Sequence, residues 1–115
     1  MDTKVSCSAS ALLATWSAHE WTEGVQLETM QDMDRLIVRT DNSTYEITLI
    51  SARSGEILIR GGRFFPEFTP VRLAGSSLGG SFLKLRGIYL GFNLEIQVDR
   101  QLIVTSRVRK ISITR

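Results

Sequence analysis

Hydrophobic and polar residues alternate along two neighbouring segments of the chain, residues 35–40 and 44–51. In the second segment Tyr45, Ile47 and Leu49 fall on one face, because successive side chains of a β-strand point to opposite sides. The residues between the two segments are few and polar, which is typical of a hairpin turn. The pattern therefore predicts two antiparallel strands joined by a tight loop.

The turn sets which side chains face each other across these strands. A two-residue loop at Asn42-Ser43 places apolar residues together on one face and opposite charges together on the other. The predicted pairs are Val38 with Ile47, Leu36 with Leu49, and Arg39 with Glu46. A third strand at residues 56–60 follows a three-residue loop at 52–54 and completes a meander. Its predicted pairs are Ile57 with Leu49 and Ile59 with Ile47.

The clearest alternation covers residues 92–99. Apolar side chains fill every second position, namely Phe92, Leu94, Ile96 and Val98. We therefore expect one face of this strand in the core and the other in solvent. A three-residue loop at 99–101 then leads toward a final strand at 108–113, with Leu102 against Val98 and Val104 against Ile96. The parity of basic and apolar residues changes along the final strand, which predicts a bulge near residues 109–110.

Glycine and proline interrupt the alternation in two places. Residues 61–70 contain both prolines of the chain, and we expect a long connection or an edge strand there, because proline has no N–H to donate to a ladder. Residues 82–90 alternate less cleanly, and the glycines in and around this stretch predict bends or bulges.

Six or seven short strands without intervening helices predict an all-β, mainly antiparallel fold. A small bent barrel and a compact sandwich both fit, and the close glycine spacing favours the barrel, whose strands bend sharply. Near the N-terminus Leu12, Leu13 and Trp16 share one side of a short predicted helix. We therefore divide the chain into a helical or loose segment, residues 1–23, and a single β domain, residues 24–115.

Cys7 is the only cysteine, so no internal disulfide can form, and a reducing compartment is the simpler expectation. The N-terminal residues match a signal peptide poorly, because their charges cancel and serines interrupt the apolar run. No window approaches the roughly 20 apolar residues of a membrane span. These features predict a cytoplasmic protein with no membrane partner.

The residues that usually carry chemistry are scarce. His19 is the only histidine, so with Cys7 it supplies too few groups for a catalytic triad or a zinc site. The glycine-rich residues 74–81 lack the Gly-Lys-Ser/Thr of a phosphate-binding loop. We expect no enzyme activity, catalytic residue, metal or cofactor, although a site built from Glu, Asp, Tyr and Arg would leave no recognisable spacing.

Charge is divided unevenly along the chain. Residues 1–50 carry eight acidic and three basic side chains, whereas residues 51–115 carry four acidic and eleven basic ones. The formal net charge of +2 therefore hides a basic second half suited to phosphate or to an acidic protein surface. Arginine predominates in this half, and guanidinium groups bind oxyanions bidentately and stack on bases.

The candidate binding residues are basic side chains of this half and two adjacent phenylalanines that would offer a stacking surface to single-stranded nucleic acid. They are Arg60, Arg63, Phe64, Phe65, Lys84, Arg86, Arg107, Arg109 and Lys110. The leading hypothesis is a non-enzymatic binding or adaptor domain whose anionic partner is nucleic acid or an acidic protein.

Two other interpretations account for the same charges. The arginines can serve solubility and protect sheet edges, while Phe64 and Phe65 close one end of the core. Alternatively, an acidic cluster docks on the basic half of the same molecule or of a neighbouring copy, and the second case would give a homo-oligomer. This cluster comprises Glu20, Glu23, Glu28, Asp32 and Asp34.

Overall fold

The computed structural model describes residues 24–78 and 81–114, and the predicted N-terminal helix lies outside these ranges. The described residues form nine strands and one short 3-10 helix. These are β1 (Gly24–Gln26), η2 (Leu27–Thr29), β2 (Arg35–Thr40), β3 (Thr44–Ser51), β4 (Glu56–Gly61), β5 (Phe65–Leu78), β6 (Ser81–Leu85), β7 (Gly87–Tyr89), β8 (Asn93–Val98) and β9 (Gln101–Thr114). None of the helices found in these ranges has the length and apolar character needed to cross a membrane.

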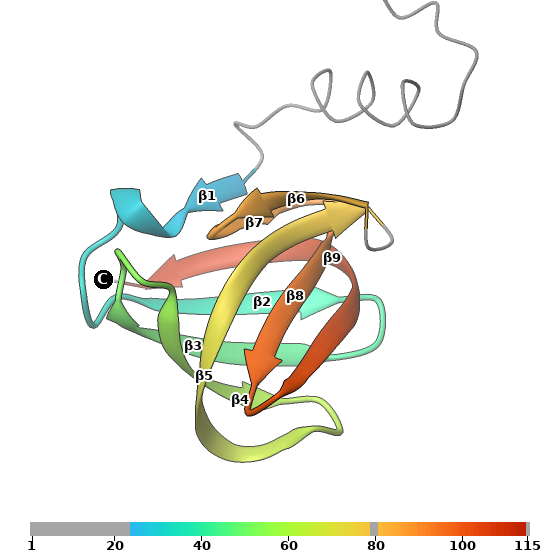
Figure 1. Cartoon of the computed structure of the whole chain (residues 1–115), viewed down its shortest axis with the longest axis horizontal. Coiled ribbons are helices and arrows are strands. Elements are labelled where there is room, and N and C mark those ends of the chain that lie inside the picture. Colours follow the sequence, from blue (N-terminus) through green and yellow to red (C-terminus); the bar gives the residue numbers. More distant parts are fainter. Residues whose placement is uncertain (1–23, 79–80, 115) are drawn as a thin grey trace, which may run out of the picture.

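The strands confirm the predicted all-β, antiparallel fold. The main sheet has the order β4-β3-β2-β9-β8-β5-β6, and an additional pairing between β4 and β5 closes six of these strands into a ring (Figure 1). Strand β6 extends beyond the ring along the end of β5, while β1 and β7 form a separate two-stranded sheet. The ring closure resolves the predicted choice between barrel and sandwich in favour of a small barrel.

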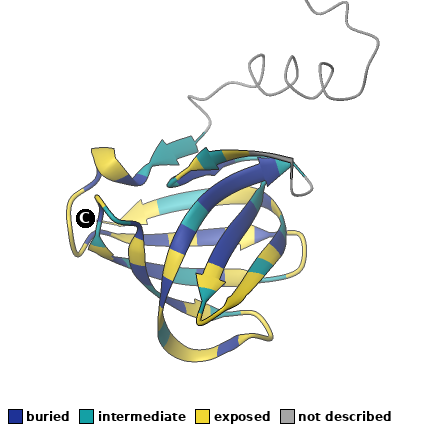
Figure 2. Ribbon diagram, in the orientation of Figure 1, coloured by how far each residue is buried: buried dark blue, intermediate teal, exposed yellow. Residues whose placement is uncertain are grey.

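The core fills the inside of this ring. In β2 and β4 buried apolar residues alternate with exposed or half-buried ones, as the sequence pattern requires (Figure 2). The residues with almost no exposed surface include Leu36, Val38, Ile47, Leu49, Ile57, Ile59, Leu73, Leu94 and Ile96. Each such side chain contributes about 1.5–3 kcal/mol relative to an exposed position, so the ring is held mainly by this apolar interior.

The register of the first hairpin differs from the prediction by two residues. The loop consists of residues 41–42, and the observed pairs are Leu36 with Ile47, Val38 with Tyr45, and Arg39 with Thr44. A shift of two preserves the faces, so the predicted inside and outside residues are correct although their partners are not. The next register is as predicted, because Ile57 faces Leu49 and Ile59 faces Ile47.

Hydrogen bonds around Thr40 explain the position of this loop. The Thr40 backbone N–H donates to the Ser43 carbonyl at 2.8 Å, and the Ser43 N–H donates to the Thr40 hydroxyl at 3.1 Å. The hydroxyl of Ser106 on β9 also donates to the Thr40 hydroxyl at 2.8 Å. These bonds fix Thr40 opposite Ser43, which the alternation alone does not specify.

Residues 61–70 are not a long connection. A three-residue turn at 62–64 follows β4, and β5 begins at Phe65 and pairs back onto β4. Pro66 lies where this pairing is irregular, and Pro70 faces Leu58. Residues 65–71 have a described partner strand on one side only, so the prolines occupy the edge-like part of β5 where no N–H is required.

The hairpin between β8 and β9 differs from the prediction by one residue. Its loop is Asp99-Arg100, and the observed pairs are Val98 with Gln101, Gln97 with Leu102, Ile96 with Ile103, and Glu95 with Val104. Asp99 has a φ of +55°, a conformation that aspartate tolerates in tight turns. The one-residue change exchanges the faces, so Leu102 and Val104 are exposed and Ile103 packs against the core.

Strand β9 continues without interruption from residue 101 to residue 114, so it includes both the predicted hairpin residues 102–104 and the predicted final strand at 108–113. The predicted bulge is confirmed: Lys110 faces Arg39 and Val108 faces Thr40, which leaves Arg109 as the extra residue. On β8 the predicted solvent face is partly wrong. Glu95 is only 7% exposed, between Gly75 of β5 and Val104 of β9.

The predicted interruption of residues 82–90 corresponds to a break between β6 and β7. Arg86 lies at the break with a φ of +52°, while β5 and β6 show a register irregularity between Ser76 and Leu78. The change of direction allows β7 to pair with β1 instead of continuing along β5.

Candidate functional site

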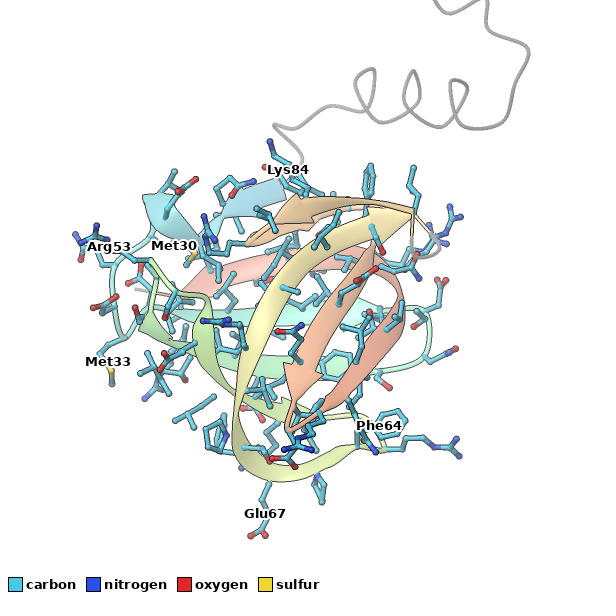
Figure 3. The ribbon with its side chains drawn as sticks, viewed as in Figure 1. Met30, Met33, Arg53, Phe64, Glu67 and Lys84 are labelled. Carbon is cyan, nitrogen blue, oxygen red and sulfur yellow. The ribbon has the colours of Figure 1, made fainter. Side chains whose placement is uncertain are left out.

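The candidate residues from the sequence do not form one patch. Phe65 is in the core with 2% of its surface exposed, so it cannot contact a partner, whereas its neighbour Phe64 is 57% exposed. Lys84 and Phe64 project from opposite sides of the barrel in Figure 3. The second half of the chain is therefore basic without being a single basic surface, because its strands are distributed around the ring.

Two of the candidate arginines are engaged within the molecule. Arg109 donates from Nε to the Asp41 Oδ1 at 2.6 Å and from Nη2 to Oδ2 at 3.2 Å. Arg60 donates to one carboxylate oxygen of Glu46, from Nε at 2.8 Å and from Nη2 at 2.7 Å. Both pairs join an acidic residue of the first half to an arginine of the second, so part of the charge division is balanced inside one chain.

The hydrogen bond from Arg109 holds the pKa of the Asp41 carboxyl below its usual range, and attraction by Arg109 and Arg107 lowers it further. Because folding lowers this pKa, the pair stabilises the fold above the unfolded carboxyl pKa and loses this effect as the pH falls through the lowered value. We expect Arg109→Gln to raise the Asp41 pKa in a carbon-13 NMR titration, and Arg107→Gln to raise it less. Equal rises would contradict the dominant role of the hydrogen bond.

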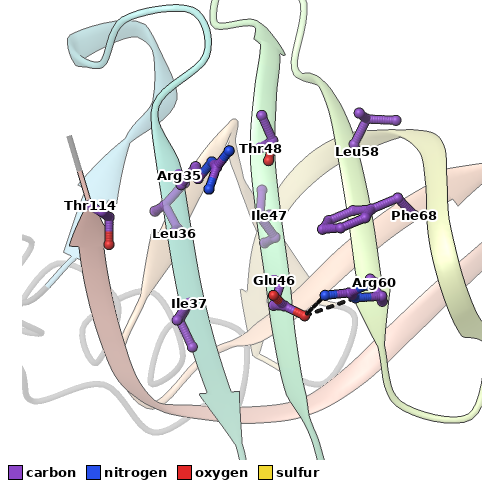
Figure 4. A pocket seen from close by; sticks show the side chains of 10 residues that line it. All are labelled: Arg35, Leu36, Ile37, Glu46, Ile47, Thr48, Leu58, Arg60, Phe68 and Thr114. Atoms are coloured by element: carbon purple, nitrogen blue, oxygen red, sulfur yellow. Dashed lines mark hydrogen bonds and ion pairs between the residues drawn. The ribbon is translucent and has the colours of Figure 1, made fainter.

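A hollow of about 340 Å³ lies on the outer surface of β2, β3 and β4 (Figure 4). We call this surface the β2–β4 face. The outward side chains that line it are Arg35, Ile37, Glu46, Thr48, Leu58, Arg60, Phe68 and Thr114. They come from adjacent strands because the pairings align them in rows: Thr48 lies between Arg35 and Leu58, and Glu46 between Ile37 and Arg60.

One side of the β2–β4 face is a planar stack. The Arg60 guanidinium carbon lies 4.4 Å from the centre of the Phe68 ring, while the guanidinium also binds Glu46. Phe68 remains 43% exposed. Glu46 therefore orients the guanidinium over the ring, and this side offers two planar groups of the kind that stack on a nucleobase.

Three cations lie on β2 and on its neighbour β9, at and beside the hollow. Arg35 lines the hollow. Ile37 follows two residues later on the same face of β2, and its side chain is 44% exposed. Arg39 follows on the same side of β2, directly opposite Lys110 of β9. Within the described ranges no salt bridge is formed by these three cations. Two like charges placed opposite each other destabilise a sheet unless an anion lies between them.

Sequence reasoning found Lys110 and Arg60 but missed Arg35, Arg39 and Phe68. The two arginines belong to the acidic first half, and only the pairing of β2 with β9 brings them beside Lys110. In the sequence, both arginines occupy polar positions of the alternation in β2, and this pattern indicated that their side chains face solvent.

The remaining candidate residues lie elsewhere. Arg63 and Phe64 line a hollow beside the β2–β3 loop, together with Tyr45, Val104 and Ser106 among others. Arg86 lines a hollow between β5, β6 and β8. Arg107 and Arg109 flank the β2–β3 loop through their contacts with Asp41.

Residues 24–78 and 81–114 contain no group of three or more His, Cys, Asp or Glu side chains able to hold a metal ion. His19 and Cys7 lie outside these ranges. Comparison with protein-family models, with curated proteins and with solved structures gives no match.

Proposed function

We propose that this chain is a non-enzymatic binding domain whose β2–β4 face takes a segment of single-stranded nucleic acid. The observation that carries the proposal is the direct opposition of Arg39 and Lys110 beside the exposed Ile37. A phosphate between the two cations would relieve their repulsion, while Ile37 would contact the adjoining sugar or base.

The spacing along β2 suits a polymer. Arg35 and Arg39 lie four residues apart on one strand, which corresponds to about 13 Å at 3.3 Å per residue. They can therefore contact phosphates that are not adjacent, and the hollow lined by Arg35 and Phe68 is open to an unstacked base. Bases in a duplex are already stacked and paired, so the single-stranded form fits this face better.

The first test compares ligand classes by fluorescence anisotropy at low salt. The probes are single-stranded DNA and RNA of about 12 nucleotides, the corresponding duplexes, and polyglutamate of similar charge. We expect the single strands to bind about tenfold more tightly than the duplexes or the polyglutamate, because only they offer accessible bases. Equal binding of single strands, duplexes and polyglutamate would show that binding depends on charge alone. A preference for polyglutamate would favour an acidic protein partner.

Self-assembly through acidic-to-basic docking is less well supported. Asp41 and Glu46 already pair within the chain, and the carboxylates of Asp32 and Asp34 accept backbone N–H groups of Ala52 and Gln31. Asp32 and Asp34, two members of the predicted acidic cluster, therefore organise the segment before β2 within the chain. A salt-sensitive oligomer in light scattering would nevertheless restore this interpretation.

A further inference from the structure

The outer surface of β6, β5, β8 and β9 carries an apolar face. Four of its side chains are between 41% and 56% exposed, namely Leu83, Leu85, Leu102 and Val104. The strand pairings join one residue of each strand into a row, in the order Leu85, Gly75, Glu95 and Val104. Leu83 and Leu102 lie two residues from members of this row, on the same side of their strands. We call this surface the leucine face, and it shares no lining residue with the hollow of the β2–β4 face.

Glu95, between Gly75 and Val104 on the leucine face, indicates what kind of group covers it. Glu95 is only 7% exposed, and among the described residues its carboxylate has no hydrogen-bond or ion-pair partner. Its oxygens are not fully enclosed, so a donor from outside the barrel can reach them. A carboxylate that is largely withdrawn from water without a donor is costly. The leucine face therefore fits an apolar group that also carries a hydrogen-bond donor.

Residues 1–23, which precede β1, contain such a group. Leu12, Leu13 and Trp16 share one side of the helix that the sequence predicts in this segment. An indole ring is apolar, and its N–H is a donor only, so Trp16 can contact the leucines and donate to Glu95 at the same time. Nucleic acid fits this face less well, because the carboxylate would repel its phosphates.

The segment is attached close to the leucine face. Gly24 pairs with Tyr89 of β7, and Tyr89 lies four residues along the chain from Leu85, a distance of at most about 13 Å (Figure 1). Residues 16–23 can span up to about 26 Å when extended, so Trp16 can reach the face. A tether of this length gives an effective concentration of about 1 mM, which favours docking on the same chain over docking on a second copy.

Charge favours the same contact. Residues 1–23 carry three acidic side chains and one lysine. Arg72 and Arg107 are exposed in the rows on either side of the row that contains Glu95. The rim of the leucine face is therefore basic, whereas the segment that would cover it is acidic.

We propose that residues 8–21 dock on the leucine face of their own chain. Trp16 lies between Leu85 and Val104 in this arrangement, and its indole N–H donates to the Glu95 carboxylate. The docking does not rest on the proposed nucleic-acid function. The variants that test it change no residue lining the hollow of the β2–β4 face, so either proposal can fail without the other.

Tryptophan fluorescence of the full chain tests the docking. Trp16 and Trp21 are the only tryptophans, so the Trp21→Phe variant reports Trp16 alone. We expect its emission to be blue-shifted, and acrylamide quenching to be at least about threefold weaker than for N-acetyltryptophanamide, because a docked ring is withdrawn from water. Emission and quenching equal to those of N-acetyltryptophanamide would overturn the proposal.

Two further variants in the Trp21→Phe background identify the surface. Leu85→Gln combined with Val104→Gln should raise acrylamide quenching at least about threefold, because the apolar contacts of the ring are lost. Ile50→Gln combined with Ile113→Gln removes two side chains that are 39% and 43% exposed elsewhere on the barrel, and it should change nothing. No effect of the first pair, or equal effects of both pairs, would reject the leucine face as the docking surface.

The indole N–H signals in proton–nitrogen NMR test the contact with Glu95. Glu95→Gln should shift the indole signal of Trp16 and leave that of Trp21 in place, since only Trp16 donates to this side chain. Glu67→Gln removes the same charge from an exposed side chain on another part of the barrel, so it should shift neither signal (Figure 3). An unchanged Trp16 signal in the Glu95 variant would overturn the proposal.

The concentration dependence separates docking on the same chain from docking on a second copy. We expect the quenching of Trp16 to stay constant over about a hundredfold range of protein concentration, with a monomer mass in light scattering. Quenching that weakens as the concentration rises, together with a dimer mass, would place the segment on a second copy and contradict the proposal.

Discussion

The variant in which Arg35, Arg39 and Lys110 are all replaced by glutamine is expected to bind single-stranded nucleic acid about 100-fold more weakly than the wild type at about 50 mM salt. Arg35 lines the β2–β4 face, Arg39 follows it on the same side of β2, and Lys110 lies opposite Arg39 on β9. None of the three forms a salt bridge within the described part of the chain, so their loss removes three phosphate contacts. All three are exposed, and the fold should be unaffected. Anisotropy titrations of both proteins with the same labelled strand measure the effect.

The matched control removes equal charge elsewhere. Arg53, Arg63 and Arg100 are exposed and line no part of the β2–β4 face. Replacing all three by glutamine should weaken binding only about threefold, through the change in the overall field of the protein. Losses of similar size in the two triple variants would show that binding depends on net charge and would contradict the assignment to this face.

The Gly75→Ala substitution is expected to destabilise the barrel by about 3 kcal/mol, because the added methyl group has no space and the backbone must move. Gly75 pairs with Leu85 of β6 on one side and Glu95 of β8 on the other. A Cβ at this position would fall on the carbonyl oxygen of Lys84 and lie 2.8 Å from its carbonyl carbon, and the φ of +152° is rare for other residues. Urea unfolding of the wild type and the variant measures this change in the free energy of unfolding.

Gly62→Ala provides the comparison. Gly62 also has a positive φ, +62°, but it lies in the exposed turn after β4, and the nearest atoms to an added Cβ belong to the side chains of Tyr45 and Ser43. Side chains can move aside, so we expect a loss of about 1 kcal/mol from the backbone conformation alone. If Gly75→Ala lowered the free energy of unfolding no more than Gly62→Ala, β5 and β6 would not pack as closely at Gly75 as the structure shows.

The alternation of residue types predicts where the strands lie but only partly how they pair. The bounds of β2 and β3 agree with the sequence pattern because each buries one face. Their register was wrong by two, since that shift preserves every face and the deciding bonds at Thr40 are local. At the β8–β9 hairpin Leu102, Ile103 and Val104 are all apolar, so the pattern offers no means of deciding which of them faces inward.

The candidate site was less accessible to sequence reasoning than the fold. Phe64 and Phe65 look equivalent in the sequence, yet the turn that ends β4 exposes the first and buries the second. Arg35 and Arg39 meet Lys110 only because β2 and β9 become neighbours when the ring closes. Dividing the chain into an acidic and a basic half does not reveal this surface, because Arg35 and Arg39 come from the first half and Lys110 from the second.

The dependence of binding on salt tests the β2–β4 face most directly. A strand that contacts three cations should give a plot of log affinity against log salt concentration with a slope of about −2, since each neutralised phosphate of a single strand contributes about −0.7. The variant lacking Arg35, Arg39 and Lys110 should give a slope near zero. An identical slope in wild type and variant, or no binding of the wild type at low salt, would contradict the proposed function.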